Sequence, residues 1–261
     1  MTSMRIPAAL GLAALLWSTG VSAETIRVGV TPGPHAQIVE ALVPVAKARG
    51  LDVRVVEFSE GARINVALQD GELEANAFQH KPYLDNQARI RSLDLVSVAD
   101  TVLLPMAAYS KRHKSLAELP DKALISIPND PTNAGRALKL LEQGGLITLK
   151  PGPGVEATIF DIVDNPRKLR IRELEAVQIP RSLEDVDLAV INTNFAIHAG
   201  LNPTRDSLVR ETAQSDYLCL LAVRRADADK PWVKALIAAY RSPEIRSFVE
   251  KKYEGSILPT W

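Results

Sequence analysis

The sequence predicts an α/β protein of two lobes joined by two hinge-crossing strands. Short segments rich in β-branched residues alternate with longer helical segments, and this order occurs twice, on either side of an extended apolar stretch at residues 95–110. Such alternation is typical of a mainly parallel sheet covered by helices. A second apolar run, at residues 217–225, is expected to return the chain to the first lobe.

The first 23 residues are expected to form a secretory signal peptide. Arg5 precedes an apolar run over residues 6–17, and small residues follow up to a cleavage point before Glu24. The apolar run is too short to span a bilayer as a helix, and it lacks the polar face of an N-terminal core helix. We therefore expect cleavage of this segment on export.

The first repeat of the pattern begins directly after the expected signal peptide. Pro34 suits the first position of a helix, and Gly50 follows the basic end of the same helix. We assign residues 24–107 and 215–261 to the first lobe. Its expected strands cover residues 25–30 and 52–58, and its expected helices cover residues 36–49, 63–69, 232–239 and 243–252.

The second repeat is assigned to residues 108–214, the second lobe. Its longest helix should end where Gly144 and Gly145 follow the last periodic residue. The expected strands cover residues 123–130, 169–174 and 187–192, and the expected helices cover residues 131–143 and 194–199.

Composition and motifs narrow the function classes. The chain has 31 Lys and Arg residues against 31 Asp and Glu residues, so no basic excess suggests nucleic acid and no charge block suggests a membrane surface. No HExxH, GxSxG, P-loop or CxxC motif occurs, and the four histidines have no metal-ligand spacing. We expect no enzyme activity, no metal and no cofactor, although nucleophile triads can assemble from distant positions.

Cysteine usage bears on location. Cys219 is the only cysteine and lies in an apolar run, so it is expected to be a small buried residue and no internal disulfide can form. The N-terminal region contains no cysteine to which a lipid could be attached. We therefore expect a protein that diffuses freely in the periplasm without a lipid anchor.

Three ring side chains are crowded into the stretch AFQHKPYLDN, which starts at residue 77. These are Phe78, His80 and Tyr83, in a chain with only 5% aromatic residues. Closely spaced rings with a few polar groups can line a small-molecule pocket. They can equally form a core cluster that closes a turn.

Two polar residues are candidates for ligand contacts. Arg136 lies two turns into the expected helix and has no carboxylate three or four positions away, so a local helical ion pair does not explain it. A guanidinium near a helix start suits a carboxylate, although a distant ion pair or solvation also accounts for it. Asn192 ends the strand DLAVIN at a sheet edge where ligands collect, although turn formation also favours asparagine there.

Several phrases of the sequence resemble one known family. They are GVTPGPHAQI, AFQHKPYLDN, LISIPNDPTNAGRAL, ATIFDIVDNP, IPRSLEDVDLAVIN and the final ILPTW. The chain is similar over nearly its whole mature length to the methionine-binding NlpA/MetQ family of substrate-binding proteins. This resemblance implies a hinged periplasmic binding protein, a monomer, that closes on a ligand and delivers it to an inner-membrane ABC permease with a cytoplasmic ATPase.

The resemblance also assigns roles to the candidate residues. It implies that Phe78, His80 and Tyr83 surround the ligand side chain, that Arg136 grips the α-carboxylate and that Asn192 contacts the polar head group.

Two departures from the family pattern bear on the ligand. Gly61 stands where the family commonly has a tyrosine, and Cys219 stands where it has an asparagine that contacts the ligand. A thiol is a poor replacement for an amide. We expect room for a bulkier group and a weakened polar anchor, so Arg136 should still hold a carboxylate while the rest of the ligand differs from free methionine. The expected ligand class is methionine, a related amino acid or a short peptide. A receptor for a non-methionine ligand, and far behind it a periplasmic hydrolase, remain alternatives.

Overall fold

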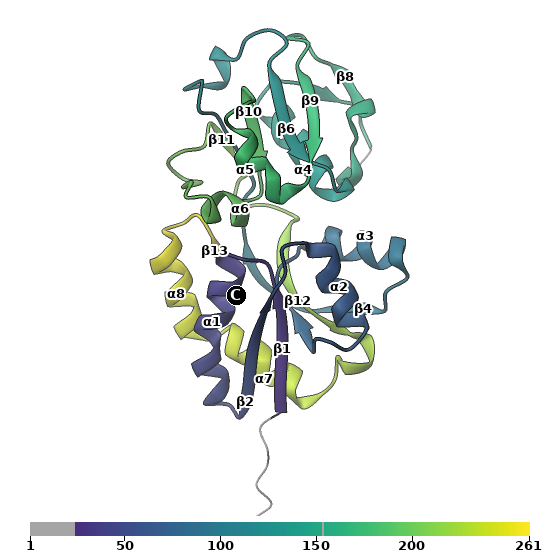
Figure 1. The fold of residues 1–261 in the computed structure, drawn as a ribbon, viewed down its shortest axis with the longest axis vertical. Helices are drawn as coiled ribbons and strands as arrows, with labels where there is room; N and C mark the ends of the chain where they lie inside the picture. The colour runs from purple at the N-terminus through teal and green to yellow at the C-terminus, as the bar shows by residue number, and fades with distance from the viewer. Residues whose placement is uncertain (1–23, 153) are drawn as a thin grey trace, which may run out of the picture.

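Two β-sheets, each with its own helices, form two lobes in the computed structural model, which describes residues 24–152 and 154–261 (Figure 1). The expected two-lobed α/β fold is confirmed. The expected signal peptide, residues 1–23, lies outside the described residues.

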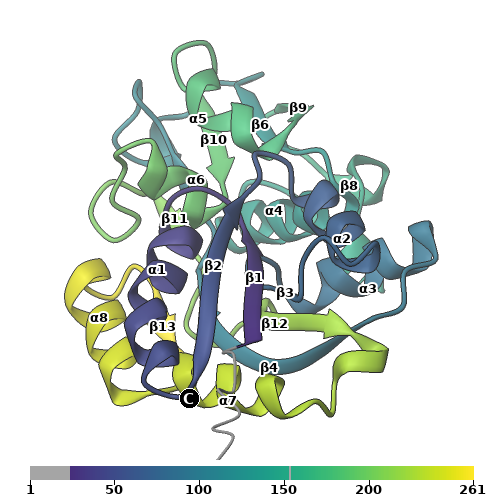
Figure 2. The same ribbon diagram turned by 60° about the horizontal axis from the view of Figure 1, so that its bottom comes forward.

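The first sheet has six strands in the order β13-β4-β12-β3-β1-β2. Its β1 pairs in parallel with β2 and β3, whereas β12 runs antiparallel to β3 and β4. Helices α1 and α8 lie together on one side of this sheet, and α2 and α3 lie on the other (Figure 2). The strands are β1 (Glu24–Val30), β2 (Leu51–Glu57), β3 (Ala75–Asn76), β4 (Leu95–Leu103), β12 (Leu218–Arg224) and β13 (Leu258–Pro259), and the helices are α1 (Pro34–Lys47), α2 (Gly61–Gln69), α3 (Lys81–Arg91), α7 (Pro231–Tyr240) and α8 (Pro243–Tyr253).

The second sheet has five strands in the order β11-β5-β10-β6-β9. Strands β10, β6 and β9 are parallel to one another, with β9 at the edge of the sheet, and β5 is antiparallel to both of its neighbours. The strands are β5 (Ala107–Tyr109), β6 (Leu124–Pro128), β9 (Arg170–Leu174), β10 (Leu188–Ile191) and β11 (Val209–Arg210), with the separate pair β7 (Thr148–Leu149) and β8 (Ile162–Asp164), and the helices are α4 (Pro131–Gln143), α5 (Ile179–Ser182) and α6 (Thr193–His198). Short 3-10 turns cover Leu116–Glu118, Gly154–Glu156, Ile159–Asp161, Ala176–Gln178 and Arg225–Asp227.

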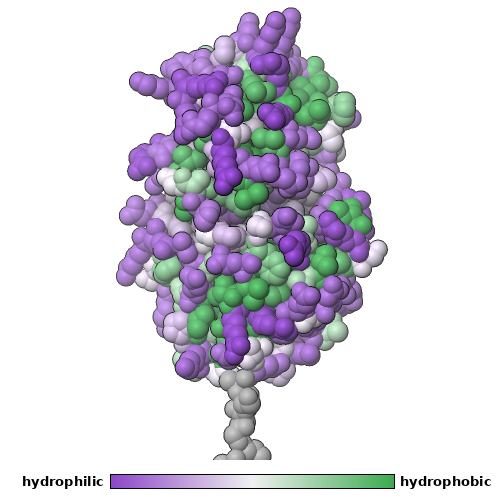
Figure 3. All heavy atoms as spheres, in the orientation of Figure 1, coloured by the Kyte–Doolittle hydropathy of each residue, from purple (hydrophilic) through white to green (hydrophobic). Residues whose placement is uncertain are grey.

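Each lobe has its own core of buried aliphatic side chains. In the first lobe Ile26, Val28 and Val30 of β1 are fully buried, and in the second lobe Ile125 and Ile127 of β6 are. On the face shown in Figure 3, hydrophilic side chains cover most of both lobes, with hydrophobic ones in small groups. Within the residues described, no helix combines the length and the apolar character needed to cross a bilayer.

The chain passes between the sheets at two short connections. The first joins β4 to β5 through residues 104–106, and the second joins β11 to β12 through residues 211–217. The strand β12 therefore belongs entirely to the first sheet, and the crossing precedes it. The expected division of the chain at residues 107/108 and 214/215 stays a prediction.

The lobes also touch through side chains away from these connections. Glu156 of the second lobe accepts hydrogen bonds from Asn86 and Arg89 of α3, each at 2.9 Å. Asn194 of α6 donates to the Thr31 hydroxyl, which follows β1, at 3.4 Å. These polar contacts span the space between the two sheets.

Candidate functional site

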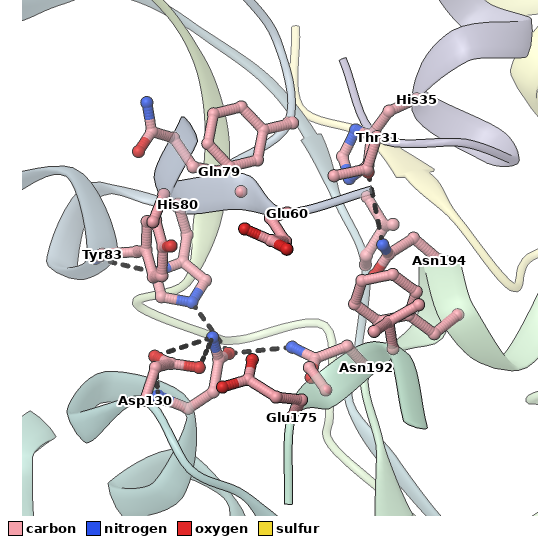
Figure 4. Close-up of a pocket in the computed structure, with 18 of the residues that line it drawn as sticks. Thr31, His35, Glu60, Gln79, His80, Tyr83, Asp130, Glu175, Asn192 and Asn194 are labelled. Carbon is pink, nitrogen blue, oxygen red and sulfur yellow. Dashed lines mark hydrogen bonds between the residues drawn. The ribbon is translucent and has the colours of Figure 1, made fainter. Parts of the chain in front are cut away.

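A cavity of about 660 Å³ lies between the lobes and is lined by residues of both (Figure 4). Its size falls in the range of roughly 300–1,000 Å³ that is usual for small-molecule sites. The structure brings all the sequence-predicted site residues to its wall. These are Gly61, Phe78, His80, Tyr83, Arg136, Asn192 and Cys219.

The three predicted rings form one end of this cavity. The Tyr83 ring meets the rings of Phe78 and His80 edge-on, with centroids 6.0 and 6.1 Å apart. The turn that begins α3 holds them there, because His80 is its N-cap residue and its Nδ1 accepts the backbone N–H of Tyr83 at 3.1 Å. A β-bridge to Cys219 fixes the backbone of His80 from the other side.

His80 is a neutral hydrogen-bond donor in this setting. Burial, and after it the charge of Arg136, lowers the pKa of His80 to about 3. Because Nδ1 already accepts a hydrogen bond, the proton resides on Nε2, which lies 3.1 Å from Oδ1 of Asn133 in α4. This bond connects the ring end of the cavity to the second lobe.

Asn133 is the centre of a buried polar network. Its Oδ1 also accepts from Nδ2 of Asn192 at 2.8 Å, and its Nδ2 donates to both oxygens of Asp130 at 3.1 and 2.9 Å (Figure 4). Asp130 caps α4 through the backbone N–H of Asn133, and burial raises the pKa of its carboxyl. Oδ1 of Asn192 is buried and has no hydrogen-bond partner among the described residues.

Arg136 is buried and paired with a carboxylate far away in sequence. Its Nε donates to Oε1 of Glu211 at 2.7 Å, and its Nη2 donates to Oε2 of Glu211 and to the backbone carbonyl of Leu104, the latter at 2.9 Å. Its Nη1 makes no hydrogen bond to any described residue, so two of the five guanidinium N–H donors remain for a ligand.

The contacts of Arg136 reach both connections between the lobes. Leu104 lies in the first connection and Glu211 in the second, and Oε2 of Glu211 also accepts the backbone N–H of Met106 at 2.8 Å. The guanidinium lies 4.4 Å from the centre of the Tyr217 ring, which meets the His80 ring edge-on at 5.1 Å. Contacts from Arg136 to Tyr217 and from Tyr217 to His80 thus connect the guanidinium to the end of the cavity that the rings form.

The two positions that depart from the family pattern have distinct surroundings. A Cβ atom placed on Gly61 would lie 2.7 Å from the Phe78 ring and 3.3 Å from the Tyr83 hydroxyl, so the Phe78 ring occupies part of the space that the glycine leaves. Burial raises the pKa of the Cys219 thiol to about 12, so the thiol remains neutral. The effect of both residues on ligand choice stays a prediction.

A second group of polar side chains lines the cavity across from the rings. It consists of Thr31, His35 and Asn194, with the Glu60 carboxylate extending between this group and the rings (Figure 4). Burial lowers the pKa of His35 to about 4, so this imidazole is neutral as well. No group of three potential metal ligands occurs in the part of the chain that the structure describes.

Sequence reasoning missed several of these residues. Asn133 and His35 lie inside phrases that carry the family resemblance, and that was the only available signal for them. Tyr217 lies two residues before Cys219, in a stretch that also resembles the family, and that was its only signal. Glu211 has no such signal, because its partner Arg136 lies 75 positions away in the chain.

Comparisons with known proteins agree with this architecture. Residues 26–261 match the family described as NlpA lipoprotein. The D-methionine-binding lipoprotein MetQ of Escherichia coli is 46% identical over 239 residues, which cover 90% of this chain and 88% of the relative.

Two solved structures are similar along nearly their whole length. A nutrient binding protein of Burkholderia cenocepacia, bound to methionine, has a TM-score of 0.89 and 47% identity, with 90% of this chain and 100% of the other covered. A periplasmic substrate-binding protein of an ABC transporter from Coxiella burnetii has a TM-score of 0.88 and 45% identity, with the same coverage.

The comparisons contradict the expected location. We expected a periplasmic protein without a lipid anchor, because no cysteine occurs near the N-terminus. The matching family and the E. coli relative are named lipoproteins, which implies a lipid-anchor cysteine in those proteins and conflicts with the expected absence of an anchor. An argument from one residue type in the N-terminal region thus gave the wrong location.

The resemblance seen in the sequence phrases is confirmed over nearly the whole described chain. The match over residues 26–261, together with 46% identity across 90% of the chain, shows that this protein belongs to the NlpA lipoprotein family.

Proposed function

We propose that this protein is the substrate-binding component of an ABC importer and that it binds methionine, a related amino acid or a short peptide in the cavity between its lobes. The observation that carries this proposal is the buried Arg136, whose free Nη1 donors meet a cavity walled by Phe78, His80 and Tyr83. A carboxylate would bind the guanidinium while an apolar side chain packs among the rings.

The relatives support the same ligand class. One solved relative is described as bound to methionine, one curated relative as D-methionine-binding, and one as a substrate-binding protein of an ABC transporter. By extension, this chain would act as a monomer that delivers its ligand to a membrane permease with a cytoplasmic ATPase.

A role as an enzyme has less support. Both cavity histidines have pKa values far below neutral, and the Cys219 thiol has a pKa of about 12, so neither an imidazole base nor a thiolate is poised for chemistry near pH 7. We therefore propose a binding protein without catalytic activity.

Calorimetry of refolded, ligand-stripped protein with L-methionine, D-methionine and methionine dipeptides tests the proposal. We expect binding to weaken at least about a hundredfold in Arg136→Met, since charge-assisted hydrogen bonds contribute roughly 1.5–3 kcal/mol each. Arg54→Met, which changes an exposed arginine that does not line the cavity, is the matched control and should bind as the parent does.

Because Arg136→Met leaves Glu211 buried and unpaired, the double variant Arg136→Met with Glu211→Met checks the effect in a protein without that penalty. Unchanged affinity in both variants would refute the carboxylate role of Arg136. Hydrolysis of a dipeptide by the parent protein would instead favour the hydrolase.

A further inference from the structure

His35 is a buried imidazole that faces the cavity without a partner. Only 3% of its surface is exposed, it lines the cavity, and its ring makes no hydrogen bond to any described residue. The turn TPGP places it there: Pro34 is the first residue of α1, and the preceding Gly33 has a φ of 87°, a conformation suited to glycine. In Figure 4 the ring lies across the cavity from His80 and Tyr83.

The start of α1 adds free donors beside this ring. The helix spans 14 residues and has no side-chain cap at Gly33. The backbone N–H groups of His35 and Ala36 have no acceptor among the described residues. Unpaired amides at a helix N-terminus, with the helix dipole behind them, attract oxygen acceptors and anions.

Two further side chains complete the same end of the cavity. The Thr31 hydroxyl follows β1, and Nδ2 of Asn194 approaches it from α6 at 3.4 Å, a long hydrogen bond. Both residues are buried, at 3% and 8% exposure. A ligand oxygen there would thus be reached by donors from both lobes.

The character of this end decides which ligand group it suits. The backbone amides of His35 and Ala36 and the Asn194 amide nitrogen donate, and the helix N-terminus carries partial positive charge, so these groups favour an oxygen acceptor. The Glu60 carboxylate, which extends between this end and the rings, is the group that a ligand ammonium would meet instead. This end is also distinct from Arg136, whose own contacts are Glu211, Leu104 and Tyr217.

On the basis of the proposed function, we propose that Thr31, His35, Asn194 and the start of α1 form a second subsite that binds a carbonyl or carboxylate oxygen. This oxygen belongs to a part of the ligand beyond the amino acid whose carboxylate Arg136 holds. The cargo is then longer than free methionine, and a cavity of about 660 Å³ has the size usual for a ligand of that kind.

Three probes and two variants test the second subsite by calorimetry. The probes are L-methionine, L-alanyl-L-methionine, which adds a peptide carbonyl, and γ-L-glutamyl-L-methionine, which adds a carbonyl and a second carboxylate. The variants are Thr31→Val, which keeps the side-chain shape, and His35→Leu. The control is Thr25→Val, in the same strand region but with an exposed hydroxyl that bonds Asp52. Thermal melts verify that every variant is folded.

We expect at least one dipeptide to bind about tenfold or more tightly than L-methionine, and each subsite variant to reduce that advantage at least about fivefold. The control should preserve it. A larger gain for the γ-glutamyl probe assigns the subsite to a carboxylate, and an equal gain for both probes assigns it to a carbonyl.

The inference is overturned if L-methionine binds as tightly as both dipeptides, or if the variants weaken all three probes equally. Those outcomes leave the proposed function intact as long as Arg136→Met abolishes binding. Failure of all three probes to bind the parent protein would overturn the proposed function itself, and the second subsite with it.

Discussion

The absence of a side chain at Gly61 sets the position of the Phe78 ring. The ring lies close to the point where a Cβ atom would be, with its Cε2 atom 2.7 Å from that point, and the Tyr83 hydroxyl lies 3.3 Å from it. Contacts shorter than 3.0 Å do not persist in packed interiors, so any larger residue at position 61 must move the ring. Gly61 thus affects the shape of the cavity through the position of the Phe78 ring.

Replacement of this glycine should change binding more than folding. In Gly61→Ala the Phe78 ring has to shift, and we expect a cost of about 1–2 kcal/mol in ligand affinity, which is a five- to thirtyfold weakening. The ring is only partly buried and can adjust toward the cavity, so the melting temperature should fall by only a few degrees. Calorimetry with the best ligand and a thermal melt measure both effects, and unchanged affinity would show that the ring does not shape the binding site.

The sequence predicted the residues of the aromatic end because they are close together in the chain. Phe78, His80 and Tyr83 fall within six positions, and one turn of backbone holds them. The partner of Arg136 could not be predicted in the same way, because nothing in the local sequence connects it to Glu211. Long-range pairs depend on how the second connection folds back over α4.

At the scale of elements, α4 is the part that joins the site to the connections between lobes. Its N-terminal turn holds Asp130 and Asn133, and its second turn presents Arg136 to Leu104 and Glu211. The ion pair is almost fully buried, with 4% and 12% of the two side chains exposed. Removal of one charge from such a pair leaves the other without compensation.

The variant Glu211→Gln separates folding from binding. It keeps the side-chain shape but leaves the Arg136 charge unpaired, so we expect the free energy of unfolding to fall by about 3 kcal/mol. A carboxylate ligand would then supply the only counter-charge, and its stabilising effect should grow. Urea unfolding with and without L-methionine measures both quantities.

The matched control is Glu184→Gln, which breaks an exposed ion pair with Lys111 and should change stability by less than about 1 kcal/mol. A Glu211→Gln protein as stable as the parent, or one that no longer responds to ligand, would contradict this account of the pair.

Element boundaries were predictable where the chain carries clear end signals. The expected helix over residues 131–143 coincides with α4, because Pro131 suits its first turn and Gly144 follows its last. The apolar runs were less informative. Hydrophobic periodicity indicates burial but does not tell in which sheet a strand is buried, so the run at residues 217–225 was expected to cross between lobes and instead lies in the first sheet.

At the scale of the whole molecule, the two buried histidines make stability depend on pH. Burial lowers the pKa of His35 to about 4 and that of His80 to about 3, whereas an unfolded chain titrates its histidines near 6.5. Below pH 6.5 the unfolded state therefore binds more protons than the folded one. The stability these groups contribute is complete above that pH and is lost as the pH falls toward the folded pKa values.

We expect the free energy of unfolding to fall by about 1.4 kcal/mol per pH unit for each histidine between pH 6 and pH 4.5. Urea unfolding at pH 7.5, 6.0, 5.0 and 4.5 measures the slope, and His35→Leu should reduce it by about half. A flat profile in the parent protein, or an unchanged slope in the variant, would show that the imidazoles accept protons without cost in the folded state.

The side-chain hydrogen bonds between the lobes have a consequence for ligand release. When the lobes separate, water replaces one partner in each hydrogen bond between them. These bonds join Glu156 to Asn86 and Arg89, His80 to Asn133, and Asn194 to Thr31. Each exchange costs only about 0.5–1.5 kcal/mol, so these hydrogen bonds oppose separation of the lobes only weakly. Under the proposed function, release of a bound ligand should then depend more on its own contacts with Arg136 and the rings than on these hydrogen bonds.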